Sequence, residues 1–128
     1  MTDHGTFCWN ELMTRDPKTA CEFYAKALGW RFEDMPMPHM PAGVYRVAKQ
    51  GDRPVAGVFE MKGKEFEGLP SHWFAYIAVD DVDQRFCAAK QAGAQVLREP
   101  FEVAGVGRIV ILKGPVGAAI GWMTPATR

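Results

Sequence analysis

Glu11 is the side chain whose type and setting are best suited to acid–base chemistry in this chain. It stands two residues after Trp9 in an apolar segment, and residues two apart on a strand share one face. An apolar cleft would raise the pKa of Glu11 and suit it to act as a general base or as a hydrogen-bond anchor for a ligand. The alternative is a strand-end carboxylate that faces solvent or pairs with Arg15, Arg46 or Arg108.

Histidine and carboxylate side chains offer one candidate metal site. His72 comes just before a predicted strand and could point inward toward Glu60, whereas His4 and His39 lie in the N-terminal segment and in a proline-rich loop. A site built from His72 and Glu60 is one hypothesis, and solvated histidines at loop ends are the other.

The three cysteines, Cys8, Cys21 and Cys87, follow no C-x-x-C spacing. An odd number would leave one thiol over in a disulfide framework, and the spacings fit no zinc pattern. Cys21 and Cys87 fall inside predicted amphipathic helices, where a free cysteine packs like a small hydrophobic residue. The sequence therefore predicts reduced, structural thiols.

Composition limits the classes of partner. The chain has 128 residues, and 15 Lys and Arg are balanced by 15 Asp and Glu. Without a basic surplus, neither nucleic acid nor an anionic membrane is an expected partner. No apolar run approaches a membrane span, and the N-terminal residues lack the pattern of an export signal. A single domain spanning 1–128 in the cytoplasm is the expectation.

Hydrophobic spacing predicts the elements that position these side chains. In the first half, Asp16 and Pro17 suit the start of a helix, apolar residues then recur at helical spacing, and Gly29 suits its end. In the second half, Asp80 and Asp81 precede a helix that ends near Gly93. The predicted strands are Phe7 to Thr14, Trp30 to Glu33, Val44 to Ala48, Pro54 to Met61, Trp73 to Val79, Gln95 to Arg98, Arg108 to Leu112, and Ala118 to Met123. Loops are predicted at Met35 to Pro41 and at Pro100 to Gly105.

The two halves repeat the same order of elements, β-α-β-β-β. A shift of 64 residues lays Trp9 on Trp73 and Gly57 on Gly121. It also matches Asp16 with Asp80, Ala25 with Ala89, Lys26 with Lys90, and Gly29 with Gly93. Because these identities coincide with the starts and ends of elements, an internal duplication is indicated, with repeats at about 1–62 and 71–128 and a linker at 63–70.

The sequence also resembles a known family along nearly its whole length. In the first half the resemblance lies in Trp9 to Pro17, Phe23-Tyr24 and Leu28-Gly29-Trp30. In the second half it lies in Ala78 to Asp83, Ala92-Gly93-Ala94, Val106-Gly107-Arg108 and Gly114 to Ala118. These segments are similar to the vicinal oxygen chelate superfamily, the fold of glyoxalases, bleomycin-resistance proteins and extradiol dioxygenases. The resemblance implies an α+β fold of two βαβββ modules whose curved mixed sheets form a shared concave cavity.

The resemblance also identifies the positions to inspect for a metal. The family's metal enzymes place one His, Gln or Glu ligand on the first and fourth strands of each half. In this sequence those positions fall at Trp9, between Gly57 and Glu60, at Phe74 (or Trp73 if the register slips by one), and near Gly121. Trp, Phe and Gly offer no side-chain ligand, so only Glu60 could serve. Because one carboxylate does not hold a divalent cation against water, the comparison with the family predicts no bound metal, and no other cofactor is expected.

Aromatic side chains are predicted to line the interior instead. Strand alternation directs Trp9 and Glu11 inward and turns Leu12 and Thr14 toward the helix. In the second half, Phe74 and Tyr76 face inward, whereas Ile77 and Trp122 face the helix. The candidate ligand-binding residues are therefore Trp9, Glu11, Tyr45, Phe59, Phe74 and Tyr76. Ordinary core packing of these rings is the alternative.

Three functions are consistent with these observations. The first is a metal-free protein that binds a small apolar or aromatic molecule. The second is an enzyme of this superfamily, either a metal-dependent lyase, isomerase or dioxygenase, or a metal-free catalyst with Glu11 as its base. The third is a mainly structural homodimer, because family members often pair through a two-fold interface. The sequence favours the first, in a protein that forms homodimers.

Overall fold

The structure, a computed structural model, describes residues 3–36, 44–103 and 106–126. The chain divides into two compact units. The N-terminal unit is Trp9–Trp73, and the C-terminal unit is Phe74–Arg128 together with Met1–Cys8. Within the described residues, neither helix is long and apolar enough to cross a membrane.

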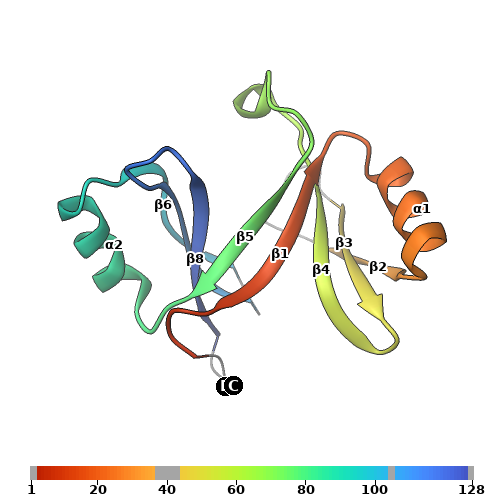
Figure 1. The fold of residues 1–128 in the computed structure, drawn as a ribbon, viewed down its shortest axis with the longest axis horizontal. Coiled ribbons are helices and arrows are strands. Elements are labelled where there is room, and N and C mark those ends of the chain that lie inside the picture. Colours follow the sequence, from red (N-terminus) through yellow and green to blue (C-terminus); the bar gives the residue numbers. More distant parts are fainter. Residues whose placement is uncertain (1–2, 37–43, 104–105, 127–128) are drawn as a thin grey trace. The chain divides into compact units, whose positions relative to one another are not determined.

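Each unit contains one helix and one mixed sheet (Figure 1). The first four strands are β1 (Phe7–Thr14), β2 (Arg31–Pro36), β3 (Val44–Gln50) and β4 (Arg53–Glu60), in the order β2-β3-β4-β1, and the helix is α1 (Pro17–Leu28). The last four are β5 (His72–Ala78), β6 (Gln95–Val103), β7 (Gly107–Lys113) and β8 (Ala119–Pro125), in the order β5-β8-β7-β6, and the helix is α2 (Val82–Gln91). The predicted α+β fold of two βαβββ modules is confirmed. The predicted shared cavity stays a prediction.

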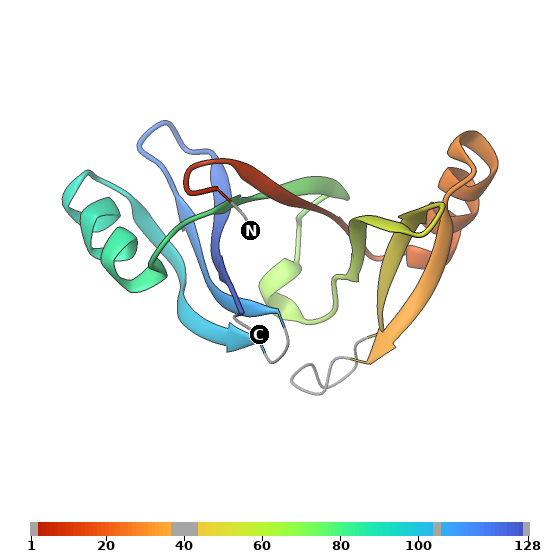
Figure 2. The ribbon, with the colours of Figure 1, turned by 90° about the horizontal axis from the view of Figure 1, so that it is seen from below.

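The helix ends are set by the residues that the sequence indicates. The Asp16 side chain accepts the Thr19 N–H at the start of α1, and the Asp81 side chain accepts the Gln84 N–H at the start of α2. Gly29 ends α1 with a left-handed backbone (φ 79°) that few other residues adopt. Each helix lies along the strands of its own unit (Figure 2).

Two strands are longer than predicted, and both contain a proline. β2 continues to Pro36, and β6 runs through Pro100 to Val103, where a loop was expected. β2 and β6 are edge strands, and at an edge the missing proline N–H costs no hydrogen bond to a neighbouring strand. β6 also shifts register against β7 between Val96 and Arg98 and again before Phe101. Beyond Pro36, the rest of the predicted loop at 35–41 lies outside the described residues.

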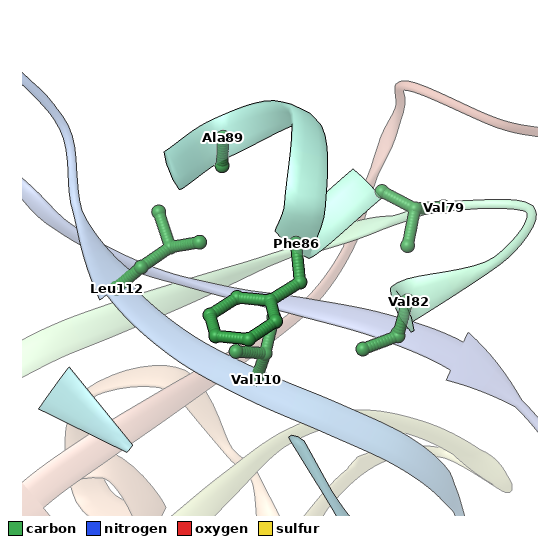
Figure 3. Close-up of a cluster of buried hydrophobic side chains, with 6 residues drawn as sticks. All are labelled: Val79, Val82, Phe86, Ala89, Val110 and Leu112. Carbon is green, nitrogen blue, oxygen red and sulfur yellow. The ribbon is translucent and has the colours of Figure 1, made fainter. Parts of the chain in front are cut away.

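The C-terminal unit has a packed core between its helix and its sheet. The phenyl ring of Phe86 on α2 lies over Val110 and Leu112 of β7 (Figure 3). Val79, Val82 and Ala89 complete the buried cluster, and Ile77, Ile120 and Trp122 pack against it. The prediction that Ile77 and Trp122 face the helix is confirmed.

The registers of the two units give the correspondence between the repeats. In the N-terminal unit Glu11 is paired with Gly57, and in the C-terminal unit Tyr76 is paired with Gly121. If Gly57 corresponds to Gly121, then Glu11 corresponds to Tyr76 and Trp9 to Phe74. The shift is therefore 65 residues in the first strand and helix, where the caps are Asp16 and Asp81, and 64 in the last strands. The identities of Ala25 with Ala89 and Lys26 with Lys90 fall one residue away from this correspondence.

Candidate functional site

A hydrogen-bonded aromatic pair covers a glycine on the face of the N-terminal sheet opposite α1. Trp9 Nε1 donates to the Tyr45 hydroxyl over 2.9 Å. A Cβ placed on Gly57 would lie 1.6 Å from that hydroxyl oxygen, so only glycine leaves room for the ring. The two predicted residues Trp9 and Tyr45 are thus brought together, and the absent side chain at Gly57 makes their arrangement possible.

Glu11 lies on the same face, since it is paired with Gly57 across β1 and β4. The side chain is buried, at 8% exposure. Arg15 donates to backbone carbonyls, Arg46 pairs with Asp34, and Arg108 pairs with Asp83 and Glu102. Glu11 also has an interaction partner in the folded chain. A carboxylate held in this setting could anchor a hydrogen-bond donor or accept a proton.

Phe59 shares this face and meets a ring that the sequence did not single out. Phe66, in a short 3-10 helix (Lys64–Phe66), contacts Phe59 edge-on with ring centroids 5.8 Å apart. The Arg15 guanidinium donates to the carbonyls of Phe66 and Leu69 and so ties this segment to the end of β1. Phe66 is the only aromatic residue of the polar stretch 63–70, which is the signal that could have indicated its role.

The C-terminal unit has a corresponding arrangement around Gly121. A Cβ on Gly121 would lie 2.4 Å from the Tyr76 ring and 3.2 Å from Phe74. Phe74 and Tyr76 contact edge-to-face, with centroids 5.3 Å apart and rings at 75°. In both units a tyrosine ring therefore occupies the space that a fourth-strand side chain would fill.

The residues at the family's ligand positions do not suit a metal. If the first half's fourth-strand position corresponds to Gly121, as the paired registers suggest, it is Gly57, and the four positions are then Trp9, Gly57, Phe74 and Gly121, none of which has a coordinating side chain. Within the described ranges no three His, Cys, Asp or Glu side chains gather closely enough to hold a cation.

The two residues of the alternative metal site have other partners. His72 Nδ1 lies 2.8 Å from the Pro70 carbonyl oxygen, and the Glu60 carboxylate pairs with Lys62 over 3.7 Å. Glu60 is paired with Thr14, whose side chain lies beside α1, so the carboxylate is on the helix side of the sheet.

The three thiols are free. Burial raises the pKa of Cys8 and also that of Cys21, which disfavours the thiolate needed for nucleophilic chemistry.

Comparison with known proteins identifies relatives of the whole chain. The family model described as Glyoxalase/Bleomycin resistance protein/Dioxygenase superfamily matches residues 5–121. The protein named "Putative glyoxylase CFP32" from Mycobacterium tuberculosis is 39% identical over 127 residues, which are 98% of this chain and 46% of that protein. The anthracycline biosynthesis protein DnrV of Streptomyces peucetius is 29% identical over 126 residues, which are 90% of this chain and 45% of that protein. The chain thus spans slightly less than half the length of these relatives.

Solved structures share the fold at low identity. Hypothetical protein BH1468 from Bacillus halodurans matches with a TM-score of 0.76 at 14% identity, covering 98% of both chains. Methylmalonyl-CoA epimerase from Mycobacterium tuberculosis matches with a TM-score of 0.68 at 13% identity, covering 95% of this chain and 89% of the epimerase. At such identities the likeness concerns the fold alone.

Proposed function

Because this chain belongs to the Glyoxalase/Bleomycin resistance protein/Dioxygenase superfamily, we propose that it binds a small apolar or aromatic molecule without a metal. The proposed ligand lies on the sheet faces opposite the helices. Its contacts in the N-terminal unit are Trp9, Glu11, Tyr45 and Phe59. Phe74 and Tyr76 are the candidate contacts on the corresponding face of the C-terminal unit, which is considered by itself.

The observation that carries this proposal is the replacement of coordinating side chains by rings that lie over glycines. Tyr45 lies over Gly57, and Tyr76 lies over Gly121. Aromatic rings that are held in place favour stacked or edge-to-face contact with a planar ligand. Glu11 adds one buried acceptor among them, which would fix the orientation of a ligand that carries a donor.

The names of the relatives are compatible with this ligand class. DnrV is named for anthracycline biosynthesis, and anthracyclines contain fused aromatic rings. We therefore propose a ligand with aromatic rings for the present chain. We also expect a homodimeric assembly and a cytoplasmic location.

The test is a titration of the ¹⁵N-labelled protein with 1-naphthol, in which the NMR chemical shifts of the backbone amides report binding. We expect saturable shifts at Trp9, Glu11 and Gly57, and about tenfold weaker binding in Tyr45→Ala. Val116→Ala is the control, because Val116 is a 93% exposed turn residue and is not among the proposed ligand contacts. Unchanged affinity in Tyr45→Ala, or equal weakening in both variants, contradicts the proposal.

A second candidate function is catalysis with Glu11 as the base. The observation in its favour is the burial of Glu11 beside the Trp9–Tyr45 pair, where a carboxylate would be shielded from water. A metal-dependent reaction is less well supported, because the ligand positions lack donors. Deuterium exchange into a bound carbon acid, lost in Glu11→Gln while binding remains, would favour the enzyme over the binding protein.

A further inference from the structure

The helix side of the N-terminal unit contains a groove that the proposed function does not use. It lies between β1 and α1 and has a volume of about 390 Å³. Leu12, Ala20, Phe23 and Tyr24 supply its apolar wall, and Thr14 and Ser71 supply hydroxyl groups. This size falls within the range of small-molecule sites.

The corresponding groove of the C-terminal unit is smaller, at about 230 Å³, and the sequence explains the difference. Arg85 lies four residues after the helix cap Asp81, as Ala20 lies four residues after Asp16. The Arg85 guanidinium extends to Asp80, with Nε and Nη2 each 2.8 Å from a carboxylate oxygen. A methyl group replaces this side chain in the N-terminal unit, and the groove stays open.

The aromatic wall of the larger groove is held in place. The Tyr24 ring stacks on Trp30 at 5.4 Å and 25°, and its hydroxyl accepts a hydrogen bond from Trp73 Nε1 over 3.3 Å. Phe23 meets Tyr24 edge-on at 4.9 Å and is 60% exposed. An exposed phenyl ring beside a fixed one can make edge-to-face contact with a third ring.

The polar end of the groove offers acceptors. Thr14 Oγ1 accepts the Asp16 N–H over 3.1 Å and the Ser71 hydroxyl over 2.9 Å. The Ser71 hydroxyl therefore donates its one proton to Thr14, and its oxygen can still accept a hydrogen bond from a ligand. Asp16 Oδ1 accepts the Thr19 N–H, and the positive end of the α1 dipole offsets the Asp16 charge, so neither an anion nor a cation is favoured.

We propose that this groove is a second small-molecule site, which takes an uncharged aromatic ring with one hydroxyl donor, such as a phenol. The ring packs between Leu12, Ala20 and Phe23, and its hydroxyl donates to Ser71. This site is on the opposite side of the sheet from the Trp9–Tyr45 pair, so it can be present or absent independently of the proposed function.

The test compares p-cresol with 4-methylanisole, which has the same ring but no donor, by amide shifts of the ¹⁵N-labelled protein. We expect saturable shifts at Leu12, Ala20 and Ser71, with p-cresol binding about fivefold more tightly. Ser71→Ala should remove that preference. Equal affinities, shifts confined to Trp9 and Gly57, or no saturable binding at millimolar concentration would overturn the proposal.

A pair of arginine variants tests the place of binding. Ala20→Arg introduces, at the corresponding position, the arginine that lines the smaller groove. It should abolish binding of both p-cresol and 4-methylanisole. Ala25→Arg makes the same change on an exposed position of α1 away from the groove and should leave binding intact. Thermal unfolding of both variants checks that they fold. Binding that survives Ala20→Arg, or is lost in both folded variants, contradicts the site.

Discussion

The helices of the two units pack differently although the units share one topology. α2 buries Val82, Phe86 and Ala89 against its sheet, whereas α1 buries only Pro17. At the position of Phe86 the N-terminal unit has Cys21. Beneath the helix, the larger residues Leu112, Ile120 and Trp122 correspond to Ala48, Ala56 and Val58.

The comparison distinguishes the features that the two units share from the side chains that fill the space between helix and sheet. Both units have the helix cap, the strand order and the fourth-strand glycine, so these features accompany the shared topology. The side chains between helix and sheet are larger in the C-terminal unit. The N-terminal unit has the larger groove there, and we expect its stability to depend less on the helix.

The largest expected effect follows from removing the ring under α2. Phe86→Ala empties the centre of the C-terminal core and should lower the free energy of unfolding by about 3 to 5 kcal/mol. Phe23→Ala, on the exposed wall of α1, should cost less than about 1 kcal/mol. Urea unfolding of both variants measures the two values. Similar losses would show that the two helices are equally packed.

The second effect concerns the glycines beneath the tyrosine rings. Gly57→Ala and Gly121→Ala must displace Tyr45 and Tyr76, and we expect each to cost about 1 to 3 kcal/mol. Gly114→Ala is the control, because a Cβ there meets open space and should change stability by less than about 0.5 kcal/mol. Gly57→Ala should also weaken 1-naphthol binding. A Gly57→Ala protein of full stability and full affinity would refute the role given to the ring.

The helix caps should be equivalent in the two units. Asp16→Ala and Asp81→Ala each remove one side-chain acceptor, from Thr19 N–H and Gln84 N–H, at a cost of about 1 kcal/mol. Asp16→Asn and Asp81→Asn keep a side-chain acceptor, so their stability should be close to that of the wild type. Thermal unfolding gives the comparison, and a silent Asp16→Ala would mean that α1 contributes nothing to cooperative folding.

The smallest effect is a pH dependence that comes from Asp80 in the C-terminal unit. Hydrogen bonds from Arg85 lower the pKa of Asp80 to about 2, below its ordinary value of 3.8. A lowered pKa contributes stability above pH 3.8 that is lost as the pH falls through 2. Asp80→Asn should therefore be less stable than wild type at neutral pH, and the difference should shrink below pH 3.8 and be small by about pH 2. Asp52→Asn, in an exposed turn, is the control, and a difference as large at pH 2 as at neutral pH contradicts the assignment.

Much of this fold was predictable because its signals are local. The pairs Asp16-Pro17 and Asp80-Asp81 indicate helix starts, and alternation assigned Ile77 and Trp122 to the helix side. The lengths of β2 and β6 were not predictable, because a proline ends a central strand but not an edge strand, and edge positions depend on the strand order. The sequence does not show that the two helix caps are 65 residues apart, because either of the adjacent aspartates Asp80 and Asp81 could cap the second helix.

The site was predictable in residue type but not in arrangement. Alternation places Trp9 and Glu11 on one face, but the sequence does not show that Tyr45 crosses over Gly57 to accept the Trp9 hydrogen bond. The groove beside α1 was also hidden. Apolar residues such as Phe23 recur at helical spacing in α1 as in α2, and spacing does not report the volume of the residues beneath.

Binding of 1-naphthol by metal-stripped and metal-loaded protein tests the central claim most directly. One sample is dialysed against EDTA and the other is loaded anaerobically with Fe, Mn, Ni and Zn, and elemental analysis gives the metal content of both. The account predicts the same Kd in the two samples and far less than one metal ion per chain. Stoichiometric metal, with binding that appears only in the loaded sample, would contradict it.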